Sequence, residues 1–71
     1  MLARFCHGSK KEDFIKDINL EFIPRVGEVV MLFLDDGPHR FKVYSVEHFF
    51  KPNHIGEITH TIGIVVDPLG A

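Results

Sequence analysis

Three histidines are the side chains of this chain best suited, by type and spacing, to chemistry. They are His48, His54 and His60, and they recur at six-residue steps. If the chain reverses direction about His54, His48 lies opposite His60 on a neighbouring antiparallel strand. Directly opposite residues have Cβ atoms about 4.5–5.5 Å apart, which suits two imidazoles sharing a Zn²⁺ or Cu²⁺ ion.

Two imidazoles alone do not make a complete metal site. Structural zinc sites usually have four ligands, and the further candidates here are only Glu47, Glu57 and Cys6. A register slip of one residue would also put the two rings on opposite faces of the sheet. We therefore expect no metal and no cofactor, with His48 and His60 as the candidate ligands if a metal binds. The simpler interpretation is that both are ordinary hydrogen-bonded or solvated histidines.

The other reactive groups lack the neighbours that catalysis requires. Cys6 is followed by His7, but adjacent residues of a strand point to opposite faces, so these side chains do not pair. The adjacent carboxylates at 12–13 and 35–36 lie in expected loops, whereas general acid–base catalysis needs groups that converge in a pocket. The chain has no glycine-rich phosphate loop and no Cys-x-x-Cys motif. We therefore predict that it is not an enzyme.

The aromatic residues indicate a binding surface instead. Phe49 and Phe50 are adjacent, so one ring must point away from the face that buries the other. An exposed ring on a small soluble domain is typical of a partner-binding surface. We predict a protein-binding site made of Phe49, Phe50, His48, Lys51 and His54. The alternative, that a hairpin loop or a barrel end buries both rings, stays open at this point.

The net charge of the chain, −2 with neutral histidines, disfavours a nucleic-acid partner. Nucleic-acid binders usually carry a basic face because phosphate contacts supply most of their non-specific affinity, and here the lysines and arginines are dispersed. A second hypothesis is an oligomer that binds or sequesters a small nucleotide-like anion. Arg25, Arg40, Lys42 and His48 would contact this anion, and aromatic rings would stack on its base.

Seventy-one residues suit one small domain, which we expect to span residues 1–71. So short a chain buries only about 60% of its unfolded surface, and such domains often need a metal, a disulfide or a partner chain. The single cysteine, Cys6, cannot form an internal disulfide, which favours a reducing cytoplasm. No apolar run of 18 residues occurs, so no membrane span is expected.

Turn residues separate five expected strands. The strongest turn signals are the Asp, Gly and Pro residues of 35–38 and the Pro, Asn and Gly residues of 51–56. The strands are expected at 3–7, 15–23, 29–34, 41–50 and 58–66. A helix stays open as the alternative for the second strand, since Ser9 and Glu12 match a capping box and short segments are ambiguous. A single helical turn near residues 9–14 is also compatible with the pattern.

Two of these strands have unusual patterns. The strand at 29–34 is apolar at every position, so both of its faces need cover from a closed barrel or another subunit. Val43 and Val46 cannot both face inward on a two-residue period, and a β-bulge near Ser45 would resolve this conflict. The pattern predicts an all-β fold, a small five-stranded antiparallel barrel of SH3-like or OB-like type.

Two stretches of the sequence, on either side of the aromatic-rich strand, resemble those of known short proteins. The stretch Ile-Pro-Arg-Val-Gly-Glu-x-Val (23–30) is followed by an aromatic-rich strand and by Ile-Val-Val-Asp-Pro-Leu (64–69). It resembles short proteins of bacterial and phage genomes that read as small β-barrels beginning with a Pro-Arg-Val-Gly-Glu corner. The resemblance implies a fold and a prokaryotic or viral setting, and no activity. A phage origin would place the protein in the host cytoplasm.

We therefore expect a non-catalytic protein-binding module that acts through the hairpin bearing the aromatic and histidine residues. By analogy with small phage-encoded proteins, it would be an inhibitor or adaptor of a host protein. The apolar strand and the surplus aromatic residues favour a homo-oligomer.

Overall fold

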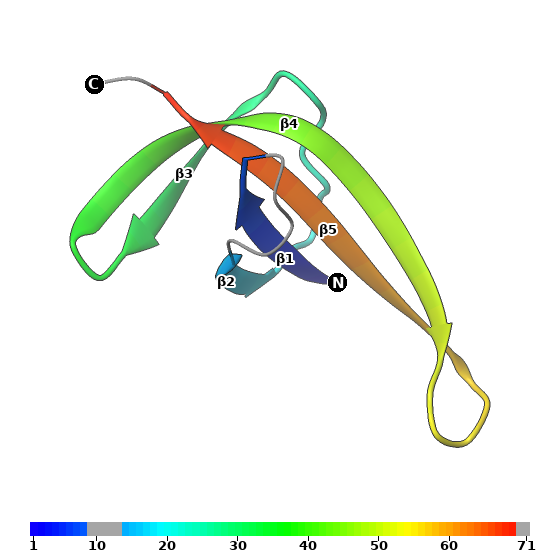
Figure 1. Cartoon of the computed structure of the whole chain (residues 1–71). Helices are drawn as coiled ribbons and strands as arrows, with labels where there is room; N and C mark the ends of the chain where they lie inside the picture. Colours follow the sequence, from blue (N-terminus) through cyan, green and yellow to red (C-terminus); the bar gives the residue numbers. More distant parts are fainter. Residues whose placement is uncertain (9–13, 70–71) are drawn as a thin grey trace.

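The fold is a single curled sheet of five strands, seen in a computed structural model that describes residues 1–8 and 14–69 (Figure 1). The strands are β1 (Leu2–His7), β2 (Phe14–Asn19), β3 (Val29–Leu34), β4 (Gly37–Pro52) and β5 (Ile58–Pro68). Their order in the sheet is β2-β1-β5-β4-β3, and the described ranges contain no helix. The predicted all-β, five-stranded, barrel-like fold is therefore confirmed.

The sheet forms a half-barrel whose two edge strands are β2 and β3. The pairs β1–β2, β3–β4 and β4–β5 are antiparallel, whereas β1 and β5 run parallel. The expected purely antiparallel barrel was wrong in this one pair. Consecutive strands joined by short turns must be antiparallel, but β1 and β5 lie far apart in the sequence, so no turn constrains their direction.

The inner, concave face of the half-barrel holds the core. Side chains alternate between the two faces of each strand, so every second residue contributes to it. The core consists of Ala3, Phe5, Leu32, Phe41, Val43, Ile62, Ile64 and Val66, each at most 6% exposed. Residues from β1, β3, β4 and β5 thus pack together across the curl.

A β-bulge in β4 lets both halves of this long strand face the core correctly. Val43 pairs with Val66 and Ser45 pairs with Val65, so Tyr44 is the extra residue. Val46 then returns to the inner face opposite Ile64. The predicted bulge near Ser45 is confirmed.

The second predicted strand was too long. The β2 strand ends at Asn19, and the backbone of Leu20 makes its last sheet-like contacts, with Met1. Phe22, which the alternation had assigned to the strand, is 84% exposed in the following loop. The helical alternative is wrong for residues 14–19, which pair with β1. Most of the helical turn expected near 9–14 falls on residues 9–13, outside the described residues.

The β3 strand has the predicted bounds, but no described residue covers its outer face. Leu32 is buried in the core, whereas Val29, Met31 and Phe33 on the outer face are about half to two-thirds exposed. No further layer of the described chain lies over these outer side chains.

The β4 and β5 strands extend beyond β1 as a two-stranded hairpin. The pair between β1 and β5 nearest the β4–β5 turn is Ala3 with Ile62, and beyond it residues 49–61 continue without a third strand among the described residues. We call residues 48–62 the arm. It projects from the body in Figure 1 and lengthens the molecule to 46 Å against 24 Å in the other two directions.

Candidate functional site

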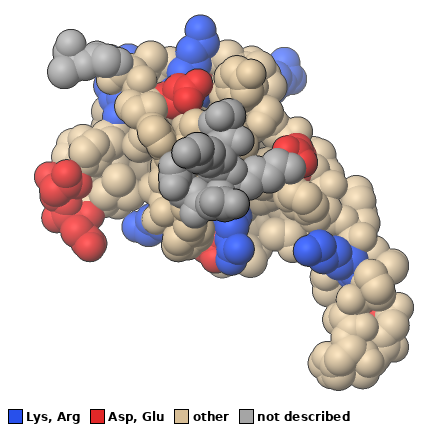
Figure 2. All heavy atoms as spheres, in the orientation of Figure 1, with Lys and Arg blue, Asp and Glu red and all other residues tan. Residues whose placement is uncertain are grey.

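The two faces of the arm differ sharply in chemistry. Its pairing register puts alternate residues on the inner face, which continues the core face of the half-barrel. The inner residues are His48, Phe50, Pro52, Ile58, His60 and Ile62. The outer residues are Phe49, Lys51, Thr59 and Thr61. The inner face of this described segment thus has no lysine, arginine or carboxylate side chain. On the face of the molecule that Figure 2 shows, the tip of the arm has almost no charged atoms.

Two histidines and one phenylalanine form a stack on the inner face. His48 Nδ1 and His60 Nε2 are 2.9 Å apart and share a hydrogen bond. The ring of Phe50 lies on that of His60, with centroids 4.5 Å apart and planes 8° from parallel. Phe50 nevertheless keeps 65% of its surface exposed. The stack therefore presents an aromatic surface to the surroundings.

The two histidines meet diagonally, which corrects the predicted register. Phe50 pairs with His60, and His48 pairs with Ile62. A shift of two residues keeps every side chain on its face, so the imidazoles still come together.

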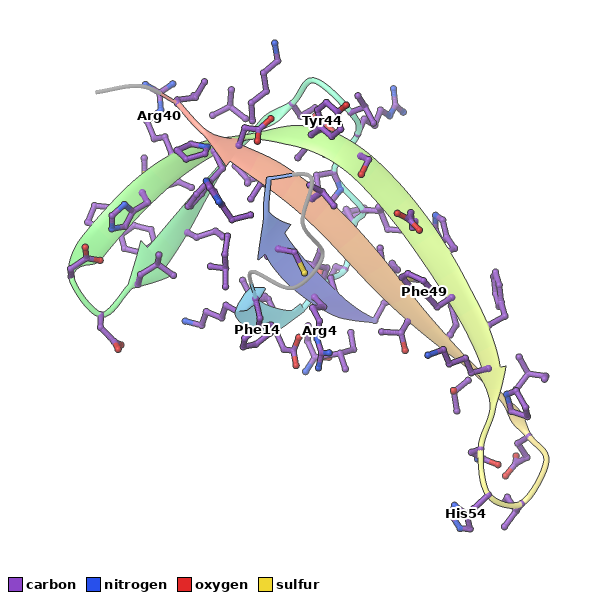
Figure 3. The ribbon with its side chains drawn as sticks, in the orientation of Figure 1. Arg4, Phe14, Arg40, Tyr44, Phe49 and His54 are labelled. Carbon is purple, nitrogen blue, oxygen red and sulfur yellow. The ribbon has the colours of Figure 1, made fainter. Side chains whose placement is uncertain are left out.

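The tip of the arm explains this shift. The side-chain oxygen of Asn53 accepts hydrogen bonds from the backbone N–H groups of Ile55 and Glu57, both 3.0 Å long. These bonds centre the reversal on Ile55 instead of His54, which lies at the tip in Figure 3. Ile55 and Ile58 are as exposed as Phe50, and sequence reasoning missed both of them. The sequence signal for them was that these two isoleucines flank a Gly-Glu turn.

The outer face of the arm separates Phe49 from Phe50, as their adjacency predicted. Phe49 lies against Gly63 of β5, where a Cβ atom would come within 2.8 Å of the ring. The ammonium group of Lys51 lies 5.9 Å from the centre of the same ring. Phe49 and Lys51 therefore belong to a different surface from His48 and Phe50.

The cationic residues proposed for anion binding are not brought together with the arm. Arg40 and Lys42 lie on the outer face of β4, whereas His48 lies on the inner face beyond the bulge. Arg25 lies in the corner before β3, where its backbone N–H is bonded to the Glu28 carboxylate. Lys42 faces Asp67 across the sheet, which reduces the positive charge there.

The described residues offer little for catalysis. No group of three His, Cys, Asp or Glu side chains within the described ranges could hold a metal ion. Cys6 is buried on the outer face, whereas His7 is exposed. Asp36 accepts a 2.6 Å hydrogen bond from His39 in the β3–β4 turn, and this bond holds the pKa of Asp36 below its usual range. This carboxylate lies at the surface, not in a pocket.

Two hollows lie elsewhere on the molecule. One of about 400 Å³ lies on the outer face between β1 and the arm, and Arg4, Phe49 and Gly63 help to line it. Arg4 is held there by the Asp17 carboxylate at 3.1 Å and lies 5.2 Å from the centre of the Phe14 ring (Figure 3). The other, of about 690 Å³, is the open mouth of the half-barrel between β2 and β3.

Comparison with protein families, with curated proteins and with solved structures finds no match. Among the described residues, none belongs to a helix that is long and apolar enough to cross a membrane.

Proposed function

We propose that this protein is a non-catalytic binding module that docks the inner face of its arm onto another protein chain. The observation that carries the proposal is the exposure of Phe50, Ile55 and Ile58 on a hairpin that projects from the body. Exposed apolar side chains grouped in this way are typical of protein–protein interfaces. An inhibitor or an adaptor would both act by such docking.

The physical chemistry of the arm supports this function. A two-stranded hairpin is at best marginally stable alone. Here the arm extends past the first residues of β1, and no described residue covers its apolar face there. A partner that covers this face would remove apolar surface from water and would also stabilise the hairpin. Because the inner face has no lysine, arginine or carboxylate, docking would not leave such a charge buried without a counter-charge.

The proposal is tested by Phe50→Ser, with Tyr44→Ser as the matched control. Both rings are exposed, at 65% and 62%, but Tyr44 lies on the body at the bulge (Figure 3). Partners recovered with the wild-type chain are purified, and their dissociation constants are measured by calorimetry for all three chains. We expect Phe50→Ser to weaken binding about 30-fold or more, since truncating an interface aromatic costs about 2 kcal/mol.

Urea unfolding of the same chains separates binding from folding. Both variants should retain the wild-type stability to within about 0.5 kcal/mol, because the rings are exposed. Equal affinity of Phe50→Ser and the wild-type chain for every purified partner would refute docking through the arm.

A further inference from the structure

We propose that the arm binds a zinc ion between two copies of this chain, with His48 and His60 of each copy as the four ligands. This inference rests on the proposed function, because it names both the partner and the ion that controls docking at the same face.

The spacing of the two imidazoles already approaches that of zinc ligands. His48 Nδ1 and His60 Nε2 are 2.9 Å apart, and one proton lies between them. Zn–N bonds are about 2.0–2.1 Å long, so two ligand nitrogens of a tetrahedral site are about 3.3 Å apart. For both nitrogens to bind zinc, the donor ring must carry its proton on its other nitrogen, and the rings must separate by a few tenths of an ångström and turn toward the ion.

The site is incomplete in one chain. Structural zinc sites have four ligands, and no third His, Cys, Asp or Glu joins this pair among the described residues. The missing two ligands must come from elsewhere. A second copy related by a twofold axis supplies an identical pair, because such an interface brings the same patch of both subunits together.

The surroundings of the pair favour a second copy of the chain. Phe50 stacks on His60, and Ile58 lies next along the same face, so two arms that meet at the ion would also bury these exposed apolar side chains against each other. Charges from Lys, Arg, Asp or Glu would oppose one another across the axis, but the inner face of the arm has none. The charged Lys51 lies on the other face. Two inner faces can therefore meet without like-charge repulsion.

The experiment titrates the untagged, chelator-treated full chain with Zn²⁺ and follows it by sedimentation velocity and native mass spectrometry. We expect a monomer without metal and a dimer that is complete at one zinc per two chains, reversed by chelator. Mg²⁺, which prefers oxygen ligands, should not produce a dimer. Co²⁺ should substitute and give the visible absorption of a tetrahedral site.

Three substitutions locate the site. His48→Ala and His60→Ala each remove two of the four ligands from the dimer. They should raise the zinc concentration needed for dimerisation more than about 100-fold, since even residues that only orient a zinc ligand contribute about 10–100-fold. His7→Ala, at the end of β1 away from the arm, should leave the titration unchanged. Urea unfolding confirms that each variant is folded.

Other outcomes would overturn the zinc bridge. These are a dimer that forms equally well without metal, one zinc bound per monomer, or zinc-dependent dimers that survive His60→Ala. A chain that stays monomeric with Zn²⁺ would also overturn it. The proposed function has its own test, since arm-dependent binding of a different protein would persist in each of these cases and would be lost in Phe50→Ser.

Discussion

At the scale of single residues, Gly63 determines how closely the outer face of the arm packs. A Cβ atom at this position would lie 2.8 Å from Cε2 of Phe49, which is inside van der Waals contact. The backbone of Gly63 does not need glycine, because its φ is not positive. Position 63 therefore needs glycine because of the ring of Phe49, and not because of the backbone conformation.

A double-mutant cycle tests this dependence. We expect Gly63→Ala to destabilise the wild-type chain by about 1–3 kcal/mol through overpacking. In a Phe49→Ala background the same change should be neutral or stabilising by up to about 1 kcal/mol, since alanine lowers the entropy of the unfolded chain. Urea unfolding of the four chains measures the coupling. Equal effects in both backgrounds would show that the ring does not set the limit.

A second residue-scale prediction concerns the pH dependence of Asp36. Because the His39 hydrogen bond lowers the pKa of Asp36 in the folded state, the pair stabilises the fold above the unfolded pKa of about 4. That contribution is lost as the pH falls through the lower folded pKa. NMR titration should give a lower midpoint for Asp36 in the wild-type chain than in His39→Ala, and identical midpoints would contradict the assignment.

At the scale of elements, the bulge at Tyr44 sets which side of the arm is apolar. Val43 and Val46 are three positions apart and both face inward, so one residue between them must be extra. Everything beyond the bulge, including the histidine pair, takes its face from this insertion.

Two single-residue deletions separate the bulge from the regular strand. Deleting Tyr44 restores an even alternation and leaves Phe50 on the inner face, so we expect a loss of about 1 kcal/mol or less. Deleting Glu47, in the regular part, shifts the following residues by one and turns Phe50 outward. That variant should lose more than about 3 kcal/mol or its arm pairing, as judged by urea unfolding and NMR. Comparable losses for both deletions would show that Tyr44 is not the extra residue.

At the scale of the whole molecule, a small core holds an open sheet. Phe5 of β1 is 2% exposed and belongs to the inner cluster, whereas Phe33 of β3 is 67% exposed on the outer face. Two phenylalanines of one chain thus have opposite environments. A domain of this size has a total stability of about 4–10 kcal/mol, so one core residue can account for much of it.

Phe5→Ala and Phe33→Ala make a matched pair of substitutions. We expect Phe5→Ala to cost about 3–5 kcal/mol and to leave much of the chain unfolded, since it removes a ring from the core. Phe33→Ala should change stability by less than about 0.5 kcal/mol. Denaturant titration at several protein concentrations measures both. A large loss for Phe33→Ala that shrinks as the protein is diluted would show that a second chain covers β3.

Patterns of neighbouring residues predicted the individual strands better than the way in which the strands pair. The apolar run of β3 has sharp limits at Val29 and Leu34, and the slip at Ser45 identified the bulge, because both depend on a two-residue period. Of the predicted surface, Phe49 and Phe50 diverge as expected, because strand geometry alone decides it. These features follow from neighbouring residues.

Two of the errors concern strand partners that lie far apart in the sequence, whereas the others are local. The parallel pair β1–β5 and the open edge at β3 depend on which strands meet, and residue alternation is the same in either case. The two-residue shift of His60 came from the Asn53 hydrogen bonds, which centre the turn on Ile55. The bulge also separates the faces of Arg40 and His48, which the anion-binding hypothesis had grouped together.

The pairing of β1 with β5 has a consequence for how the protein is made. The β1 strand can pair with its central neighbour only when residues 62–66 have left the ribosome, well after β1 itself has emerged. Until then, Phe5 in the β1–β2 hairpin lacks its core partners from β5. Topologies rich in such distant pairings fold slowly, in milliseconds to seconds. The sheet therefore cannot assemble until β5 has emerged, and until then the nascent chain exposes its future core.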